Sequence, residues 1–194
     1  MNYVNKNELI KYPHHLNLLY YTWETHNLEI CEKLARALCL LRKLKSCVSF
    51  NMLITSYYSF FHCHLLYGVQ LWGNCSTADS VFIWQKKAIR LIAGIKDGDT
   101  CEPAFLQYEI MTLPSLYIFQ NIINVKENLH LFSCRSDINS YNTRKKHELN
   151  TPNPHLSKSI KCNLYLQLKL FSKIPKIPLM IRKFDNKTFK KILT

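Results

Sequence analysis

Residues 77–94 read TADSVFIWQKKAIRLIAG, and this stretch decides the fold class. Its apolar residues recur at spacings of three and four, which predicts an amphipathic helix. Ser76 or Thr77 suits the N-cap of this helix, and Gly94 suits its end. The positions expected to be buried are Val81, Trp84, Ala88 and Leu91. The basic residues on the opposite face are Lys86, Lys87 and Arg90.

The preceding sequence predicts two further helices. One begins near residues 22–27 and closes on a basic last turn, where cations suit the helix dipole. The second spans about 50–67, with Ser49 suited to cap it and Gly68 to end it. Residues 69–75 are expected to form a loop. The basic residues that close the first helix are Arg42, Lys43 and Lys45.

The following sequence predicts shorter helices separated by turns. Asp99 or Thr100 is expected to cap a short helix that runs to about Tyr108. Thr112 is expected to cap a fifth helix that ends near Leu131. A polar, irregular segment follows, and further helices are expected at about 161–172 and 186–193. No convincing alternating strand pattern appears, so the expected class is all-α.

We therefore expect an irregular bundle of about five main helices with a basic, partly irregular C-terminal third. Three parts are distinguished along the chain. Residues 1–21 form a poorly defined lead-in, residues 22–132 a helical domain, and residues 133–194 a basic segment with one or two short helices.

The charge of the chain is concentrated at its C-terminal end. The 194 residues carry 26 Lys and Arg against 13 Asp and Glu, a formal net charge of +13. Residues 135–194 account for +11 of this excess. Such a surface binds polyanions without reading base sequence, and its other interpretation is a solvated face that serves solubility.

Glycine and cysteine usage exclude several classes of protein. All four glycines fall between residues 68 and 98, which leaves no glycine-rich phosphate loop or dinucleotide fingerprint. Most of the eight cysteines lie in helical patterns as small apolar residues, so we expect reduced thiols in the cytoplasm or nucleus. The N-terminal sequence has no apolar signal-peptide core, and we expect no signal peptide.

Residues 50–72 carry no formal charge and are long enough to span a bilayer. Their polar side chains favour a buried core helix instead, and we expect no membrane partner. The strongest metal candidate, His62-Cys63-His64 with Cys75, lacks zinc-site spacing, because residues two apart on a helix point to nearly opposite sides. We expect no metal site and no small-molecule substrate.

Asp97 and Asp99 flank a glycine and could hold Mg²⁺, but a turn followed by a helix cap explains them better. No nucleophile motif for covalent catalysis is present, so no catalytic residue is assigned.

Several blocks of the sequence occur in an order that is similar to a known family. YYSFFH at 57–62 runs into LLYGVQLWGN at 65–74, and VFIWQKKAIR at 81–90 follows. LPSLY at 113–117 and YNTR at 141–144 come later. The region from Tyr21 to Phe132 thereby resembles the C-terminal part of reverse transcriptases, RNA-directed DNA polymerases, of jockey-like non-LTR retrotransposons. The flanking blocks that also match are TWETH at 22–26, LARA at 34–37, LRKLK at 41–45 and NLHLF at 128–132.

The resemblance implies the thumb and the helical segment after it, which grip the template–primer duplex by its backbone. It gives Lys86, Lys87 and Arg90 the role of phosphate contacts. A second candidate set is Arg144, Lys145 and Lys146.

The chain departs from the family in lacking the fingers, the palm and the Tyr/Phe-x-Asp-Asp motif that holds two Mg²⁺ in the parent polymerase. We therefore expect a truncated transposable-element fragment, inactive as an enzyme and without a cofactor of its own, that binds RNA/DNA or DNA backbone non-specifically. The alternative is a helical protein-interaction fragment or an inactive relic, and self-association through the surface that faced the palm is expected of it.

Overall fold

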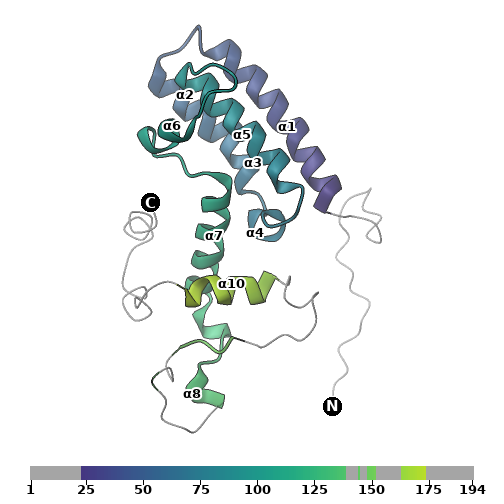
Figure 1. Cartoon of the computed structure of the whole chain (residues 1–194), viewed down its shortest axis with the longest axis vertical. Helices are drawn as coiled ribbons and strands as arrows, with labels where there is room; N and C mark the ends of the chain where they lie inside the picture. The colour runs from purple at the N-terminus through teal and green to yellow at the C-terminus, as the bar shows by residue number, and fades with distance from the viewer. Residues whose placement is uncertain (1–22, 139–143, 145–147, 152–162, 174–194) are drawn as a thin grey trace.

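The computed structural model describes residues 23–138, 144, 148–151 and 163–173, and these residues are helical, with no β-strand among them (Figure 1). The predicted all-α class is confirmed. In Figure 1, α1, α2, α3 and α5 lie side by side at one end of the molecule, and α7 runs away from them toward the other end.

Helix α1 (Trp23–Leu44) forms the first long rod of the bundle. It starts within the predicted range, and Arg42 and Lys43 stand in its last turn as expected. Its buried residues recur at intervals of three and four, as one face of an α-helix requires. These buried residues are Asn27, Ile30, Leu34, Ala37, Leu38 and Leu41.

The second rod is a continuous helical segment with a π-helical turn in its middle. It consists of α2 (Phe50–Tyr57), the π turn η1 (Tyr58–His62) and α3 (Cys63–Leu66). Gly68 follows in a left-handed conformation with φ of 62°, so the predicted extent and terminator are confirmed. Ser49 is the N-cap residue, but its side chain makes no capping hydrogen bond.

The π turn coincides with a run of side chains that bond back to the helix. Each donates to the carbonyl four residues earlier, which competes with the regular backbone ladder and bends helices. The donors are Thr55, Ser56, Ser59 and Cys63, at donor–acceptor distances of 3.0, 2.8, 3.0 and 2.9 Å.

The predicted loop at 69–75 is wrong in its first half, because residues Val69–Trp72 form helix α4. Trp72 is fully buried, and its indole Nε1 donates a 2.8 Å hydrogen bond to the Tyr67 carbonyl. Gly73 is required by space, since a Cβ there would lie 2.6 Å from the Val69 carbonyl oxygen and 2.7 Å from Tyr117 Cδ2. Burial of the Trp72 indole stabilises residues 69–72 as a helix.

Helix α5 (Ala78–Ala93) is the third rod and runs parallel to α1. At the start of both helices, Asn27 Nδ2 donates a 2.7 Å hydrogen bond to Thr77 Oγ1. At their ends, Lys45 Nζ donates a 2.6 Å hydrogen bond to the Leu91 carbonyl. Thr77 is the N-cap residue, but its hydroxyl bonds Asn27 rather than its own helix. Gly94 ends the helix with φ of 73°, as predicted.

The connection to α7 contains the short helix α6 (Glu102–Gln107) with Pro103 in its first turn. Its N-cap is Cys101, so the predicted capping by Asp99 or Thr100 is wrong. Residues 95–100 belong to the turn before the helix. Arg90 Nε holds this turn by donating a 3.0 Å hydrogen bond to the Asp99 carbonyl.

Helix α7 (Leu113–Glu127) starts as predicted, because Thr112 Oγ1 accepts a 3.4 Å hydrogen bond from the Ser115 amide. It ends at Glu127, four residues before the predicted end, and the 3₁₀ turn η2 (Leu129–Leu131) follows.

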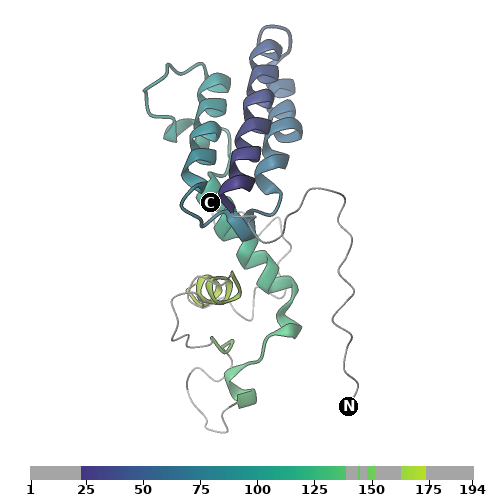
Figure 2. The same cartoon turned by 90° about the vertical axis from the view of Figure 1, so that its right-hand side faces the viewer.

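The part of the molecule beyond the bundle is built on α7 (Figure 2). Helix α10 (Asn163–Ser172), predicted at about 161–172, crosses α7, and Asn124 Nδ2 donates a 3.1 Å hydrogen bond to Gln167 Oε1. Leu168 and Phe171 of α10 belong to the same buried cluster as the bundle core. The short helix α8 (Arg135–Ile138) lies in the segment expected to be irregular. The lead-in 1–21 and the predicted helix at 186–193 lie outside the described residues.

Candidate nucleic-acid interface

The three basic residues predicted on α5 share one solvent-facing side of that helix. Lys87 is exposed, and Lys86 and Arg90 are half-buried. They lie within one turn of each other, so a single linear polyanion can contact all three. Ile83 lies on the same side and is 52% exposed, which makes the surface a mixture of cations and apolar carbon.

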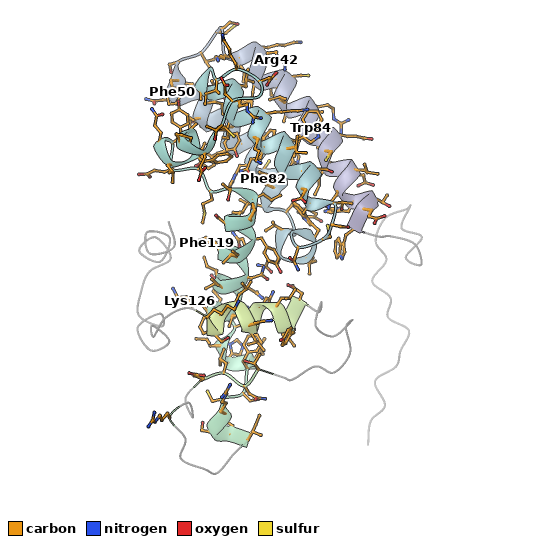
Figure 3. All side chains as sticks on the ribbon, in the orientation of Figure 1. Arg42, Phe50, Phe82, Trp84, Phe119 and Lys126 are labelled. Atoms are coloured by element: carbon orange, nitrogen blue, oxygen red, sulfur yellow. The ribbon has the colours of Figure 1, made fainter. Side chains whose placement is uncertain are left out.

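Each lysine of this set rests on an aromatic ring of its own helix. Lys86 Nζ lies 4.3 Å from the centroid of the Phe82 ring, and Lys87 Nζ lies 4.4 Å from that of Trp84. Figure 3 labels both rings on α5. The contacts bury the aliphatic stems of the lysines and restrict their rotamers while leaving the charge near solvent. A ligand that binds these amines therefore loses less side-chain entropy than it would on free lysines.

Arg90 is held by the turn that follows α5. Its Nε donates a 3.0 Å hydrogen bond to the Asp99 carbonyl. Within the described part of the chain, no carboxylate forms an ion pair with Arg90, Lys86 or Lys87. The positive charge of this side of α5 is consequently not neutralised by a neighbouring side chain.

A buried glutamine fixes how α5 is rotated about its axis. Gln85 is 0% exposed, and its carboxamide bonds three residues in two other parts of the chain. Nε2 donates to the Met111 carbonyl at 2.9 Å and to the Tyr57 hydroxyl at 3.2 Å, and Oε1 accepts from the Leu113 amide at 2.8 Å. Because Gln85 faces the core, Lys86 and Lys87 must face away from it.

Gln85 also corrects the predicted buried stripe. Val81 and Ala88 are buried as expected, but Trp84 and Leu91 are only half-buried. The helix is turned so that Gln85, Ile89 and Ile92 take the inner positions. Sequence reasoning missed this residue, because the predicted buried stripe consisted of Val81, Trp84, Ala88 and Leu91. The available signal was that position 85 lies between Val81 and Ala88 on the apolar side of the helix.

The second predicted set is described only in part. Arg144 is an exposed turn residue. Lys145 and Lys146 lie outside the described residues, so the structure does not show whether the set acts together.

The metal candidates do not converge in space. Across residues 23–138, 144, 148–151 and 163–173, no three His, Cys, Asp or Glu side chains lie close enough to hold a metal ion. His62 is buried inside the π turn while Cys63 is exposed, and Asp97 and Asp99 are both exposed. None of the seven described cysteines is in a disulfide. Among the helices of the described residues, none has the length and apolar character needed to cross a membrane.

Burial and neighbouring charge shift several pKa values in the bundle. Burial raises the pKa of Tyr57 far above its ordinary value, and the Gln85 hydrogen bond partly opposes this shift. Burial, followed by the positive charges of Lys33 and Arg36, lowers the pKa of His64 below 6.5. Lys33 and Arg36 belong to α1, which contacts α3.

Comparison with protein-family models, curated protein sequences and solved structures finds no match for this chain.

Proposed function

We propose that this chain is the thumb and post-thumb region of a reverse transcriptase of a jockey-like non-LTR retrotransposon, and that it binds the backbone of RNA/DNA or DNA non-specifically. The assignment rests on the ordered sequence blocks between Tyr21 and Arg144. The all-α fold is compatible with it. Two of the blocks coincide with structural constraints, the buried Trp72 beside the crowded Gly73 and the buried Gln85 before two lysines.

The observation that supports the binding proposal is that the α5 cations are held in position by neighbouring groups and are not neutralised. Lys86 and Lys87 are positioned over aromatic rings, Arg90 is oriented by a backbone carbonyl, and no described carboxylate neutralises them. Phosphate oxygens are the natural partners of such a row, and they carry no base sequence information. The ligand we propose is therefore defined by its charged backbone rather than by its sequence.

This chain alone is proposed to be catalytically inactive. Phosphoryl transfer by polymerases requires carboxylates that hold two metal ions about 4 Å apart. The 194 residues contain no Asp-Asp pair, and the parent family's Mg²⁺ is held by the palm, which the sequence does not include. Any part in polymerisation would be to hold the template–primer duplex.

The test is the salt dependence of binding to an RNA/DNA duplex, measured by fluorescence anisotropy on the full chain. We expect binding that weakens linearly with the logarithm of salt concentration. A variant with Lys86→Gln and Lys87→Gln is expected to reduce the magnitude of that slope by about 2, because each lost phosphate contact removes about 1.

The matched control is Lys33→Gln with Arg36→Gln, which removes the same charge from the α1 surface beside α3. It is expected to leave the slope unchanged. Absence of salt-dependent binding by the unaltered chain at low salt would overturn the proposal. Equal effects of the two variants would show that only net charge matters, which would remove α5 from the proposal.

A second candidate function, that of a helical self-association or protein-interaction fragment, is favoured by the outer face of α2, η1 and α3. This face exposes large apolar side chains, and the sequence between Lys45 and Asp79 has no formal charge. Several large apolar side chains exposed on one helical segment favour an interaction site there. The exposed residues are Met52 at 58%, Phe60 at 48%, Leu66 at 39% and Tyr67 at 73%.

A further inference from the structure

The parallel arrangement of α1 and α5 brings two helix ends together. The Asn27–Thr77 hydrogen bond joins the starts of the two helices, and the Lys45–Leu91 hydrogen bond joins their ends. Figure 1 shows the two rods side by side along their length. Residues that close α1 in the sequence are therefore neighbours of residues that close α5, although about half of the bundle sequence separates them.

Both helices carry their acids early and their bases late. Helix α1 has three glutamates in its first half, and Arg42 and Lys43 at its end. Helix α5 has Asp79 in its first turn and its three basic residues in the second half. Because the helices are parallel, these gradients add instead of cancelling. One end of the bundle is acidic and the other is basic. The glutamates are Glu24, Glu29 and Glu32.

The basic end is exposed. Arg42 and Lys43 of α1 and Lys96 in the turn after α5 are all solvent-exposed. Figure 3 labels Arg42 at the end of the bundle where α1 finishes. The Arg90–Asp99 hydrogen bond keeps the turn that carries Lys96 beside the last turn of α5. Asp97 and Asp99 are exposed in the same turn, so positive charge is in excess there but does not stand alone.

Stabilisation of the helix dipoles accounts for only part of this charge. Cations near a helix C-terminus stabilise it by about 0.3–1 kcal/mol when exposed. Lys45 performs this role for α5, since its amine bonds the Leu91 carbonyl. For Arg42 and Lys43, no described carbonyl or carboxylate accepts a hydrogen bond from the side chain. Their charged groups are free to contact a ligand.

We propose that Arg42, Lys43 and Lys96 extend the α5 basic side into one continuous phosphate-binding surface across the ends of α1 and α5. This inference rests on the proposed nucleic-acid function and names a second row of contacts for the same ligand. A duplex that contacts Lys86, Lys87 and Arg90 continues past the end of α5. A longer duplex therefore gains contacts that a short one cannot make.

The experiment uses the full chain and RNA/DNA duplexes of two lengths, one shorter than a helical turn and one of about 20 base pairs. Arg42→Gln with Lys43→Gln is expected to reduce the magnitude of the salt slope by about 2 on the longer duplex and by much less on the short one. The Lys33→Gln, Arg36→Gln variant is the matched control, since it removes one lysine and one arginine from the middle of the same helix, about two turns before its basic end.

The outcomes distinguish a failure of this inference from a failure of the proposed function. If the unaltered chain binds with a salt-dependent affinity but the Arg42, Lys43 variant matches the control, the extended surface is wrong and the α5 interface stands. If no binding occurs at low salt, both fail. If vesicles rich in phosphatidylserine are bound more tightly than either duplex at the same salt, the surface is a membrane contact and the inference is overturned. Circular dichroism confirms that each variant remains helical.

Discussion

Gln85 contributes to the fold through both ends of its carboxamide. Its oxygen satisfies the amide that opens α7, and its nitrogen satisfies the carbonyl of Met111 and contacts the Tyr57 hydroxyl. A buried polar group left without its partner costs about 1–3 kcal/mol. One side chain therefore couples the second rod, the third rod and the start of α7.

Gln85→Leu is expected to lower the free energy of unfolding by about 2–4 kcal/mol, because it leaves a buried amide and a buried carbonyl unpaired. Chemical denaturation followed by circular dichroism measures the loss. The control is Gln107→Leu, the same change at an exposed position of α6, which should alter stability by less than about 0.5 kcal/mol. Similar losses in both variants would disprove the structural role of the carboxamide.

Prediction from sequence succeeded where a local signal sets the structure. Gly68 and Gly94 end their helices in left-handed conformations, and Thr112 caps α7 through its side chain. It failed where a tertiary contact decides. Thr77 makes no capping bond: its backbone is in the right-handed helical region, and its hydroxyl accepts from Asn27, fifty residues earlier in the chain. The helical spacing could have indicated the inner position of Gln85, but no local pattern links it to its partners Tyr57 and Leu113.

At the scale of elements, α1 and α3 are coupled through charge. The pKa of His64 on α3 is lowered first by burial and then by Lys33 and Arg36 of α1. A histidine whose pKa is lower in the folded state favours folding above its ordinary pKa near 6.5. That contribution is lost as pH falls below 6.5, because protonation then favours the unfolded chain.

Lys33→Gln with Arg36→Gln is therefore expected to raise the pKa of His64 toward its ordinary value, measured by NMR titration of the imidazole signals. The stability of this variant should depend less on pH between 7 and 5 than that of the unaltered chain. The pKa of His26 gives the comparison, because it is lowered first by burial and only last by Lys33, so it should rise less than that of His64. An unchanged His64 titration would contradict the proximity of α1 and α3 charges.

Helical geometry also determines how much of the candidate interface could be predicted from the sequence. Helical periodicity alone places Lys86, Lys87 and Arg90 on one side of α5, and the structure agrees. The aromatic supports follow from the same spacing, since Phe82 lies four residues before Lys86 and Trp84 three before Lys87. The junction with the end of α1 could not be predicted, because the direction of one helix relative to another is not a property of either helix.

At the scale of the whole molecule, the outer face of α2, η1 and α3 exposes several large apolar side chains, while the ends of α1 and α5 are basic. We expect concentration-dependent self-association through the apolar face, measured by sedimentation velocity. Met52→Ser with Phe60→Ser should weaken it by about tenfold or more, because two largely exposed side chains lose their apolar burial in the complex.

The control for this measurement is Leu106→Ser with Leu131→Ser, which changes two apolar side chains on α6 and η2 that are even more exposed. It should leave the association constant unchanged. A chain that stays monomeric at all concentrations would remove self-association from the candidate functions. An equal effect of the control would indicate non-specific aggregation instead of an interface on the second rod.

The carboxamide of Gln85 also sets an order in time for a chain that emerges from the ribosome N-terminus first. Tyr57 and Gln85 are synthesised before Met111 and Leu113, the residues that satisfy most of the buried group. The three rods can associate as soon as α5 has emerged, but until the start of α7 follows, the centre of the bundle holds an incompletely paired polar group. The nascent bundle gains its full stability only when the next helix begins.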